Sequence, residues 1–147
     1  MHVQGDRALE SFLKALGPTL ERRIIRQALK AGGAQILKRA KQLAPKGKTG
    51  NLRRSLAVSR GRRIRKYPHG NLVAILGPSW PLGAHGHLIE KGTRLRKTKD
   101  GASRGRMPAQ PFMGPAFEGR KERALRVLRE KIRQGIKREL AKVRQGK

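Results

Sequence analysis

Apolar residues recur at helical spacing at both ends of the chain. Within residues 6–16 the apolar side chains follow i, i+3, i+4, i+7 spacing, which predicts a first helix. We predict that Asp6 is the N-cap of this helix. A second stripe begins after Gly17-Pro18 and stops at Ala44-Pro45, which predicts a helix over 18–43. The apolar positions of these two helices are Leu9, Phe12, Leu13, Leu16, Leu20, Ile24, Ala28, Ile36, Ala40 and Leu43.

Two adjacent glycines, Gly32 and Gly33, interrupt the middle of the second helix. Each costs about 1 kcal/mol relative to alanine in a helix interior. That cost predicts either a kink or a close packing contact at this point, and of the two we favour the kink.

Short apolar runs separated by Gly and Pro replace the helical spacing in the middle of the chain. Strand-like basic stretches surround SLAVSRGRRIRK, with Leu56, Val58 and Ile64 as their apolar positions. The run NLVAILGP at 71–78 predicts a buried strand, and the link YPHGN before it predicts a hairpin turn.

The glycine-rich stretch APKGKTGN allows two interpretations. Gly47-Lys48-Thr49 supplies the end of a phosphate-binding loop, but Gln42 stands where the opening glycine is required. We therefore interpret the stretch as a turn in which Thr49 or Asn51 caps one helical turn carrying Leu52 and Leu56. No cofactor site is predicted.

A polar segment and a final helix complete the chain. Residues 93–111 show no apolar periodicity, and loops this long without structure of their own are usually functional or disordered. We predict that the last helix begins near Pro115 and runs to about Arg144. Its apolar face would consist of Leu125, Leu128, Ile132, Ile136, Leu140 and Val143.

This order of elements predicts an α+β fold, in which N-terminal helices and a long C-terminal helix pack on a small antiparallel β-sheet. A length of 147 residues suits a single domain over 1–147, with a basic loop at 94–110 and a C-terminal helix at 115–144.

The net charge of the chain predicts the kind of partner that it binds. Lys and Arg total 37 against nine Asp and Glu, which gives a net charge of +28 and predicts a polyanionic neighbour. No segment reads as a signal peptide or a transmembrane helix, and we expect no membrane partner. A strongly basic nucleic-acid-binding protein, either ribosomal-type or a binder of the duplex backbone, is the generic interpretation. The chain has only one Trp, one Tyr and three Phe, so we do not expect base stacking to be its main mode of nucleic-acid binding.

The spacing His85-x-His87-x-x-Glu90 within AHGHLIEKGT invites a metal site. The two histidines share a face only in an extended strand, because on a helix they point about 200° apart. No third ligand stands at a recognisable spacing, so we predict no metal site and interpret the histidines as ordinary hydrogen-bonding residues. Most of the nine acids lie in or beside predicted helices, and the chain has no cysteine. We predict no catalytic constellation and no enzyme activity.

Three blocks in order carry a family resemblance: KTGNLRRSL at 48–56, HLIEKGT at 87–93 and QPFMGPAFE at 110–118. Together with their spacing, they resemble the head-tail joining proteins of long-tailed bacteriophages, also called neck or tail-completion proteins. The matched residues form an expected assembly motif: Thr49, Gly50, Leu52, Ser55, Glu90, Gly92, Thr93, Pro111, Phe112, Pro115 and Ala116.

The resemblance implies a non-catalytic virion protein of the neck, made in the host cytoplasm, that assembles as a ring of six subunits. Its implied partners are the head connector or head-closure protein on one side and a tail terminator or tail tube protein on the other. The charge of +28 is higher than the resemblance leads us to expect.

Physical chemistry suggests roles for several motif positions. Gly92 permits a left-handed turn that Thr93 can cap, and Phe112 is predicted to pack in the core. Glu90 is expected to form an ion pair or to accept backbone hydrogen bonds, with a solvated surface carboxylate as the alternative.

The basic loop has three possible roles. Its cations could touch genome DNA without reading bases, could dock on an acidic neighbouring ring, or could belong to a mobile solvated loop. These cations are Arg94, Arg96, Lys97, Lys99, Arg104 and Arg106.

Overall fold

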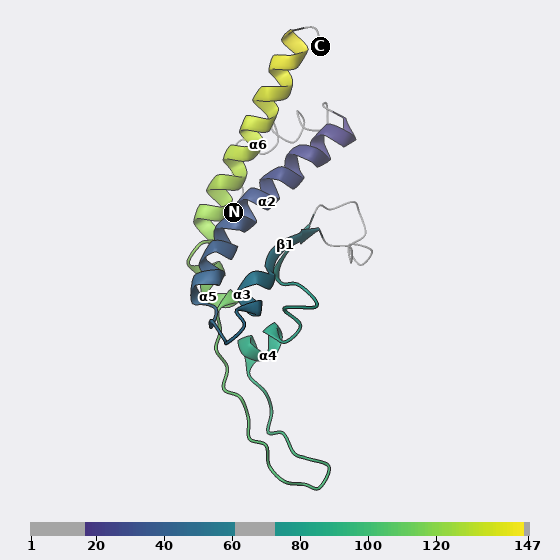
Figure 1. Cartoon of the computed structure of the whole chain (residues 1–147). Helices are drawn as coiled ribbons and strands as arrows, with labels where there is room; N and C mark the ends of the chain where they lie inside the picture. Colours follow the sequence, from purple (N-terminus) through teal and green to yellow (C-terminus); the bar gives the residue numbers. More distant parts are fainter. Residues whose placement is uncertain (1–16, 61–72, 146–147) are drawn as a thin grey trace.

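The computed structural model describes residues 17–60 and 73–145. The predicted first helix over 6–16, Ile64 and the predicted turn YPHGN lie outside the described residues. In chain order the elements are α2 (Pro18–Leu43), α3 (Asn51–Ser55), β1 (Leu56–Arg60), β2 (Ala74–Pro78), α4 (Gly86–Lys91), α5 (Met113–Glu118) and α6 (Lys121–Arg144) (Figure 1). This arrangement confirms the predicted α+β class with a long C-terminal helix.

The two long helices, α2 and α6, lie side by side and run in opposite directions (Figure 1). The predicted bounds of α2 are confirmed: Pro18 stands in its first turn, and the helix ends at Leu43 before Ala44. The prediction of a single C-terminal helix that begins near Pro115 is wrong, because the chain turns at Gly119 and Arg120 between α5 and α6. There the Arg120 N–H donates to the Phe117 carbonyl at 3.1 Å, which closes the end of α5.

The predicted apolar face of α6 is only partly the face that packs. Ala124 and Ile136 are buried against α2, whereas Leu125 is 45% exposed and Leu140 is 37% exposed. The buried face of α6 is therefore rotated toward Ala124, and it includes a carboxylate, Glu139, that is only 7% exposed.

The negative charge of Glu139 is balanced by two cationic side chains between the long helices. It accepts a hydrogen bond from the Arg23 guanidinium of α2 at 2.6 Å and another from the Lys142 ammonium at 3.2 Å. The bond from Lys142, together with that from Arg23, outweighs the opposing effect of burial and lowers the pKa of Glu139.

Gly32 and Gly33 serve close packing. A Cβ on Gly32 would lie 2.9 Å from the Ala124 carbonyl oxygen, and one on Gly33 would lie 2.8 Å from Leu76 Cδ2. Helix α2 continues through both residues without a break in its assignment. The structure thus bears out the close contact, on α6 at one glycine and on the sheet at the next, and the kink that we favoured stays a prediction.

Strands β1 and β2 form a two-stranded antiparallel sheet with Val58 opposite Leu76 and Leu56 opposite Pro78. The strand predicted within 71–78 is present as β2, but the prediction that it is buried is wrong. Its residues are mostly half-buried, and Ile75 is 44% exposed, because α2 covers only one face of the sheet.

The core lies where α2 meets the start of α3, the sheet and α5. Phe112 is 1% exposed there, as predicted. The buried residues around it are Ile36, Leu37, Ala40, Ala44, Leu52, Leu56, Ala116 and Ala124.

Candidate functional site

Residues 93–107 form a two-legged hairpin, which we call the arm, that extends from the end of α4 away from the long helices (Figure 1). Its legs are joined by backbone hydrogen bonds from Thr93 to Met107 at 3.0 Å, from Arg104 to Arg96 at 2.7 Å and from Thr98 to Ala102 at 2.9 Å. The segment predicted to lack structure of its own is therefore ordered by pairing between its legs. At about 3.3 Å per extended residue, a leg of seven residues reaches roughly 20 Å.

Positive charge is concentrated along the arm. All six of its cations are exposed: Arg94, Arg96, Lys97, Lys99, Arg104 and Arg106. Arg96 and Arg104 lie opposite each other, and like charges directly opposite destabilise a two-stranded ribbon. Within 17–60 and 73–145, none of the ion pairs includes an arm cation. The arm thus presents cations that have no acidic partner within the described part of the chain.

The arm is held at its root by Glu90. The carboxylate accepts hydrogen bonds from the backbone N–H groups of Phe112 at 2.8 Å, Met113 at 3.0 Å and Gly114 at 3.1 Å. These N–H groups form the start of α5, where a helix has no internal acceptors for them. We call this set of bonds the root clamp, because it ties the helix before the arm to the helix after it.

The root clamp also stabilises the negative charge of Glu90. Burial raises the pKa of this carboxyl, but the hydrogen bonds from Met113, Phe112 and Gly114 together outweigh it and leave the pKa below its usual value. Of the alternatives for Glu90, the structure supports the acceptor of backbone hydrogen bonds.

Further contacts close the root around the clamp. Gly92 has φ +73° and ψ −174°, and a Cβ there would lie 2.7 Å from the Met107 carbonyl oxygen. The positive φ that favours glycine is therefore present, but its ψ is not that of the predicted left-handed turn. Thr93 does not cap that turn as predicted; its hydroxyl accepts from the Met107 N–H at 2.8 Å and joins the two legs. The Gln110 N–H donates to the Ile89 carbonyl at 2.8 Å.

The first motif block packs next to the root of the arm, through Leu52. The predicted helical turn is present as α3, but its N-cap is Gly50 at φ +64°, with no side-chain capping bond, so the predicted cap by Thr49 or Asn51 is wrong. Thr49 only accepts a long bond from the Asn51 N–H at 3.4 Å. Leu52 is 4% exposed in the core.

Ser55 is buried at the end of α3, where its hydroxyl donates to the Leu52 carbonyl at 2.7 Å. Its own carbonyl accepts two bonds at 2.9 Å from Ser79, one from the backbone N–H and one from the hydroxyl. Ser55 therefore fastens the turn that follows β2.

The third block places two residues in the core and leaves two outside. Phe112 and Ala116 are buried, whereas Pro111 and Pro115 are exposed. Leu52, Phe112 and Ala116 belong to one apolar cluster, against which Ile89 packs. The structure thus brings residues of all three blocks together at the arm root, a proximity that their sequence spacing alone did not reveal.

The histidines do not form a metal site with Glu90. His85 is the N-cap of α4 and His87 lies in its first turn, where the ring Nδ1 is 2.9 Å from the Ala84 carbonyl. Within the described ranges, no group of three or more His, Cys, Asp or Glu side chains could hold a metal ion.

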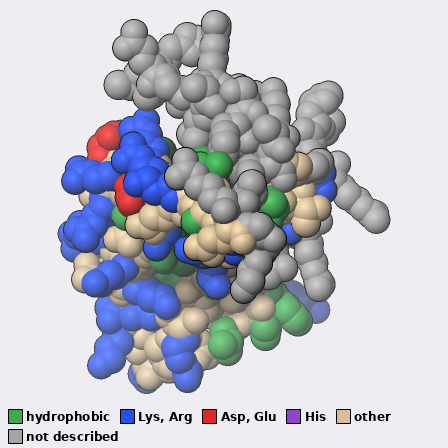
Figure 2. Space-filling model, turned by 90° about the horizontal axis from the view of Figure 1, so that it is seen from above, with side chains coloured by type: hydrophobic (Ala, Val, Ile, Leu, Met, Phe, Trp, Pro, Cys, Tyr) green, Lys and Arg blue, Asp and Glu red, His purple; other side chains and the backbone are tan. Residues whose placement is uncertain are grey.

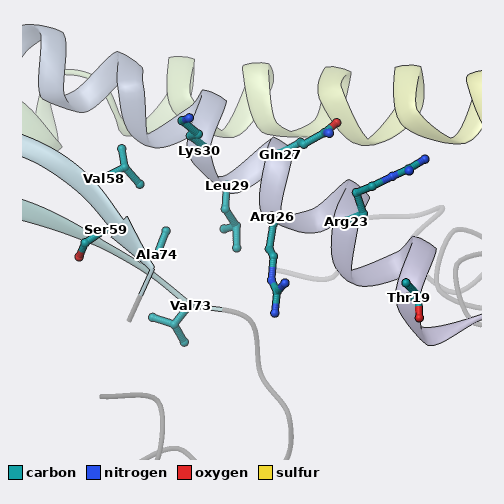
Figure 3. Close-up of a pocket in the computed structure, with 10 residues that line it drawn as sticks. All are labelled: Thr19, Arg23, Arg26, Gln27, Leu29, Lys30, Val58, Ser59, Val73 and Ala74. Atoms are coloured by element: carbon teal, nitrogen blue, oxygen red, sulfur yellow. The ribbon is translucent and has the colours of Figure 1, made fainter. Parts of the chain in front are cut away.

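A hollow lies between α2 and the ends of the two strands (Figure 3). It has a volume of about 770 Å³ and is open to solvent. Arg26 and Leu29 of α2 project into it, and Val58 and Ala74 of the sheet line it at one side (Figure 3). Its described lining contains cations, apolar groups and the polar side chains of Thr19, Gln27 and Ser59, but no carboxylate or histidine.

Lys and Arg side chains cover much of the described surface in Figure 2, while acidic side chains appear only at one edge. Hydrophobic side chains interrupt this cationic cover in a few places (Figure 2). In the parts of the chain that are described, no helix combines the length and apolarity needed to cross a membrane.

Comparison with known proteins supplies a family. Residues 7–92 match the model of a family described as "Bacteriophage HK97-gp10, putative tail-component". No curated protein and no solved structure gives a significant match. The matched range contains the first block and the second up to Gly92, while the whole arm and the third block lie beyond it. Because the match covers more than half of the 147 residues, the chain belongs to the HK97-gp10-like family of phage tail components.

Proposed function

We propose that the protein forms a ring, of six subunits, in the phage neck, where it joins the head connector to the tail and surrounds the path of the DNA. A phage tail component belongs to the virion and contacts other virion proteins, and the family match is the first support for this proposal. The observation that carries the proposal further is the arm, which projects its cations away from the body of the subunit.

The construction of the arm suits contact with something outside the subunit. Paired legs and the root clamp reduce the conformational entropy that would be lost on binding. Opposed arginines on such a ribbon repel each other until an anion lies beside them.

Genome DNA is the anion that we propose for the arm. The arm contains six cations, one acid, Asp100, and two large apolar side chains, Leu95 and Met107, but no aromatic residue that could stack on bases. Contacts of this composition bind phosphates and position the duplex without reading its sequence. An acidic surface on an adjoining ring is the competing partner for the same cations.

The ring is tested by mass. Sedimentation and native mass spectrometry of the purified chain should give a stable closed oligomer near six subunits. A monomer at all concentrations, bound to nucleic acid in a salt-sensitive manner, would instead favour the ribosomal-type or duplex-backbone binder.

The arm is tested by replacing its six cations with glutamine, which preserves the backbone pairing. The matched control replaces six exposed cations of α6 with glutamine: Arg123, Arg126, Arg129, Lys131, Lys137 and Arg138. If the arm contacts phosphates, its variant should bind duplex DNA more weakly than the control at equal net charge, with a smaller salt dependence.

Assembly in infected cells provides the second readout. Deleting residues 95–106 should leave heads and tails unjoined when this variant replaces the phage's own protein. Normal virions from the deletion would contradict both the DNA role and the protein-docking role of the arm. Unchanged DNA affinity of the glutamine variant, together with failed joining, would favour docking on an acidic ring.

A further inference from the structure

A closed ring of identical subunits needs two different, complementary patches on each subunit, because its contacts are head-to-tail. We propose that Trp80 of one copy enters an apolar groove between α2, β2, α5 and α6 of the next copy. This inference rests on the proposed ring and specifies the contact that would build it.

Trp80 is the only tryptophan of the chain and is 83% exposed. It lies in a turn at residues 79–84, together with Leu82, which is 47% exposed. The apolar pattern of the sequence did not mark this turn, although a lone Trp next to Pro81 was visible in it. A large aromatic side chain that is exposed to solvent is typical of interaction sites.

The Trp80 turn is rigid because it is fastened on both sides. Ser79 donates twice to the Ser55 carbonyl, and the Gly83 N–H donates to the Ser79 carbonyl at 2.7 Å. Gly83 is buried so tightly that a Cβ there would lie 2.5 Å from both Pro78 Cβ and Ser55 Oγ. Little conformational freedom remains to be lost when the indole is bound.

The receiving groove has a volume of about 290 Å³, close to the lower end of the roughly 300 to 1,000 Å³ typical of small-ligand pockets. That size suits one bicyclic side chain. The groove is lined by Leu29, Gly32, Gly33, Ile36, Ala74, Leu76, Phe117, Lys121, Ala124, Leu125 and Leu128. At its mouth Phe117 is 49% exposed and Leu125 is 45% exposed.

Charge favours a second copy as the occupant. Two chains of net charge +28 repel each other over most of their surfaces, so they can approach only where charge is low. Among the described residues that line the groove, Lys121 is the one charged group, and its ammonium is paired with Glu118 at 2.7 Å. An exposed apolar turn and an apolar groove whose described lining carries only one, paired, cation are thus the complementary patches that a head-to-tail contact needs.

The single tryptophan makes the contact directly observable. As the wild-type chain is concentrated from monomer to ring, its fluorescence emission should shift to shorter wavelength and its quenching by acrylamide should fall. Replacing Trp80 by Ala, or replacing both Phe117 and Leu125 by Gln, should weaken assembly at least 10-fold as measured by sedimentation. Leu95→Gln is the matched control, because Leu95 is 58% exposed on the arm and should be neutral.

The outcomes separate this contact from the ring itself. Rings that form with a solvent-exposed tryptophan signal, and equally well from Trp80→Ala, would overturn the contact while leaving the proposed function intact. A wild-type chain that stays monomeric would overturn both. If a groove variant loses its helical circular dichroism, the wild-type emission and quenching decide alone.

Discussion

Glu90→Gln tests whether the root clamp depends on the charge of the carboxylate. The replacement keeps the length of the side chain and one oxygen acceptor. In the wild type one oxygen of Glu90 accepts from Phe112 and Met113, and the other accepts from Gly114. Glutamine can keep two of these bonds as neutral ones, but its amide nitrogen cannot accept the third.

Hydrogen bonds to a charged partner contribute about 1.5 to 3 kcal/mol each, and neutral ones about 0.5 to 1.5 kcal/mol. Weakening two bonds and losing a third would cost roughly 3.5 to 6 kcal/mol if no water could replace them. Gly114 is exposed, so water can satisfy its N–H, and we expect a net loss of about 2 kcal/mol. For a chain of this length that loss lowers the unfolding midpoint by about 4 to 8 °C.

The pH dependence identifies the charge as the cause. The folded-state pKa of Glu90 lies below its unfolded value of about 4.3, so its contribution is present above that unfolded value. It is lost as the pH falls through the lowered folded pKa. Urea unfolding of both proteins at several pH values should therefore show a stability difference that shrinks on acidification.

Glu130→Gln is the control for this experiment, because Glu130 is exposed on α6 and should change stability by less than about 0.5 kcal/mol. A difference between wild type and Glu90→Gln that is equal at pH 7 and pH 3, or below about 0.5 kcal/mol at neutral pH, would refute the charge-based account of the clamp.

Three further predictions concern stability. Gly92→Ala should cost about 1 to 3 kcal/mol more in unfolding free energy than Gly101→Ala, because both have positive φ but only the Cβ at Gly92 meets backbone atoms; equal losses in urea titrations would contradict this. Phe112→Ala should cost about 3 to 5 kcal/mol by calorimetry, since the ring is 1% exposed, and a loss below 1 kcal/mol would place it outside the core. Glu139→Gln should lower the thermal midpoint at neutral pH, because its lowered pKa marks a carboxylate stabilised by Lys142 and Arg23. That difference should shrink as the pH falls through the lowered pKa.

The bounds of helix α2 could be predicted from the sequence, because residues at its own two ends determine them. Pro18 at the start of α2 and Ala44-Pro45 after its end set the bounds of that helix correctly. The break between α5 and α6 was missed because one helix was predicted from Pro115 onward, although residues 118–123, EGRKER, contain no apolar side chain. Glycine tolerates both a helix and a turn, so only the packing of Ala116 in the core fixes the choice.

The candidate site depended on contacts between distant segments, which spacing does not encode. The family resemblance selected Glu90 as a motif residue, but the residues that it binds are more than 20 positions later. Pairing between Arg96 and Arg104 was also hidden, because neither leg of the arm shows the apolar alternation of a buried strand. An alternation signal requires one face against a core, and the arm has none.

The root clamp has a mechanical consequence. Both legs of the arm leave the body at one place, where Glu90 binds the start of α5 next to Phe112. A pull on the arm tip therefore loads the two legs together and stretches the root bonds in parallel, so that several must break at once. The same pull reaches the most deeply buried ring of the core. In the neck ring that we propose, such an attachment would transmit force to the whole subunit instead of peeling the arm away one leg at a time.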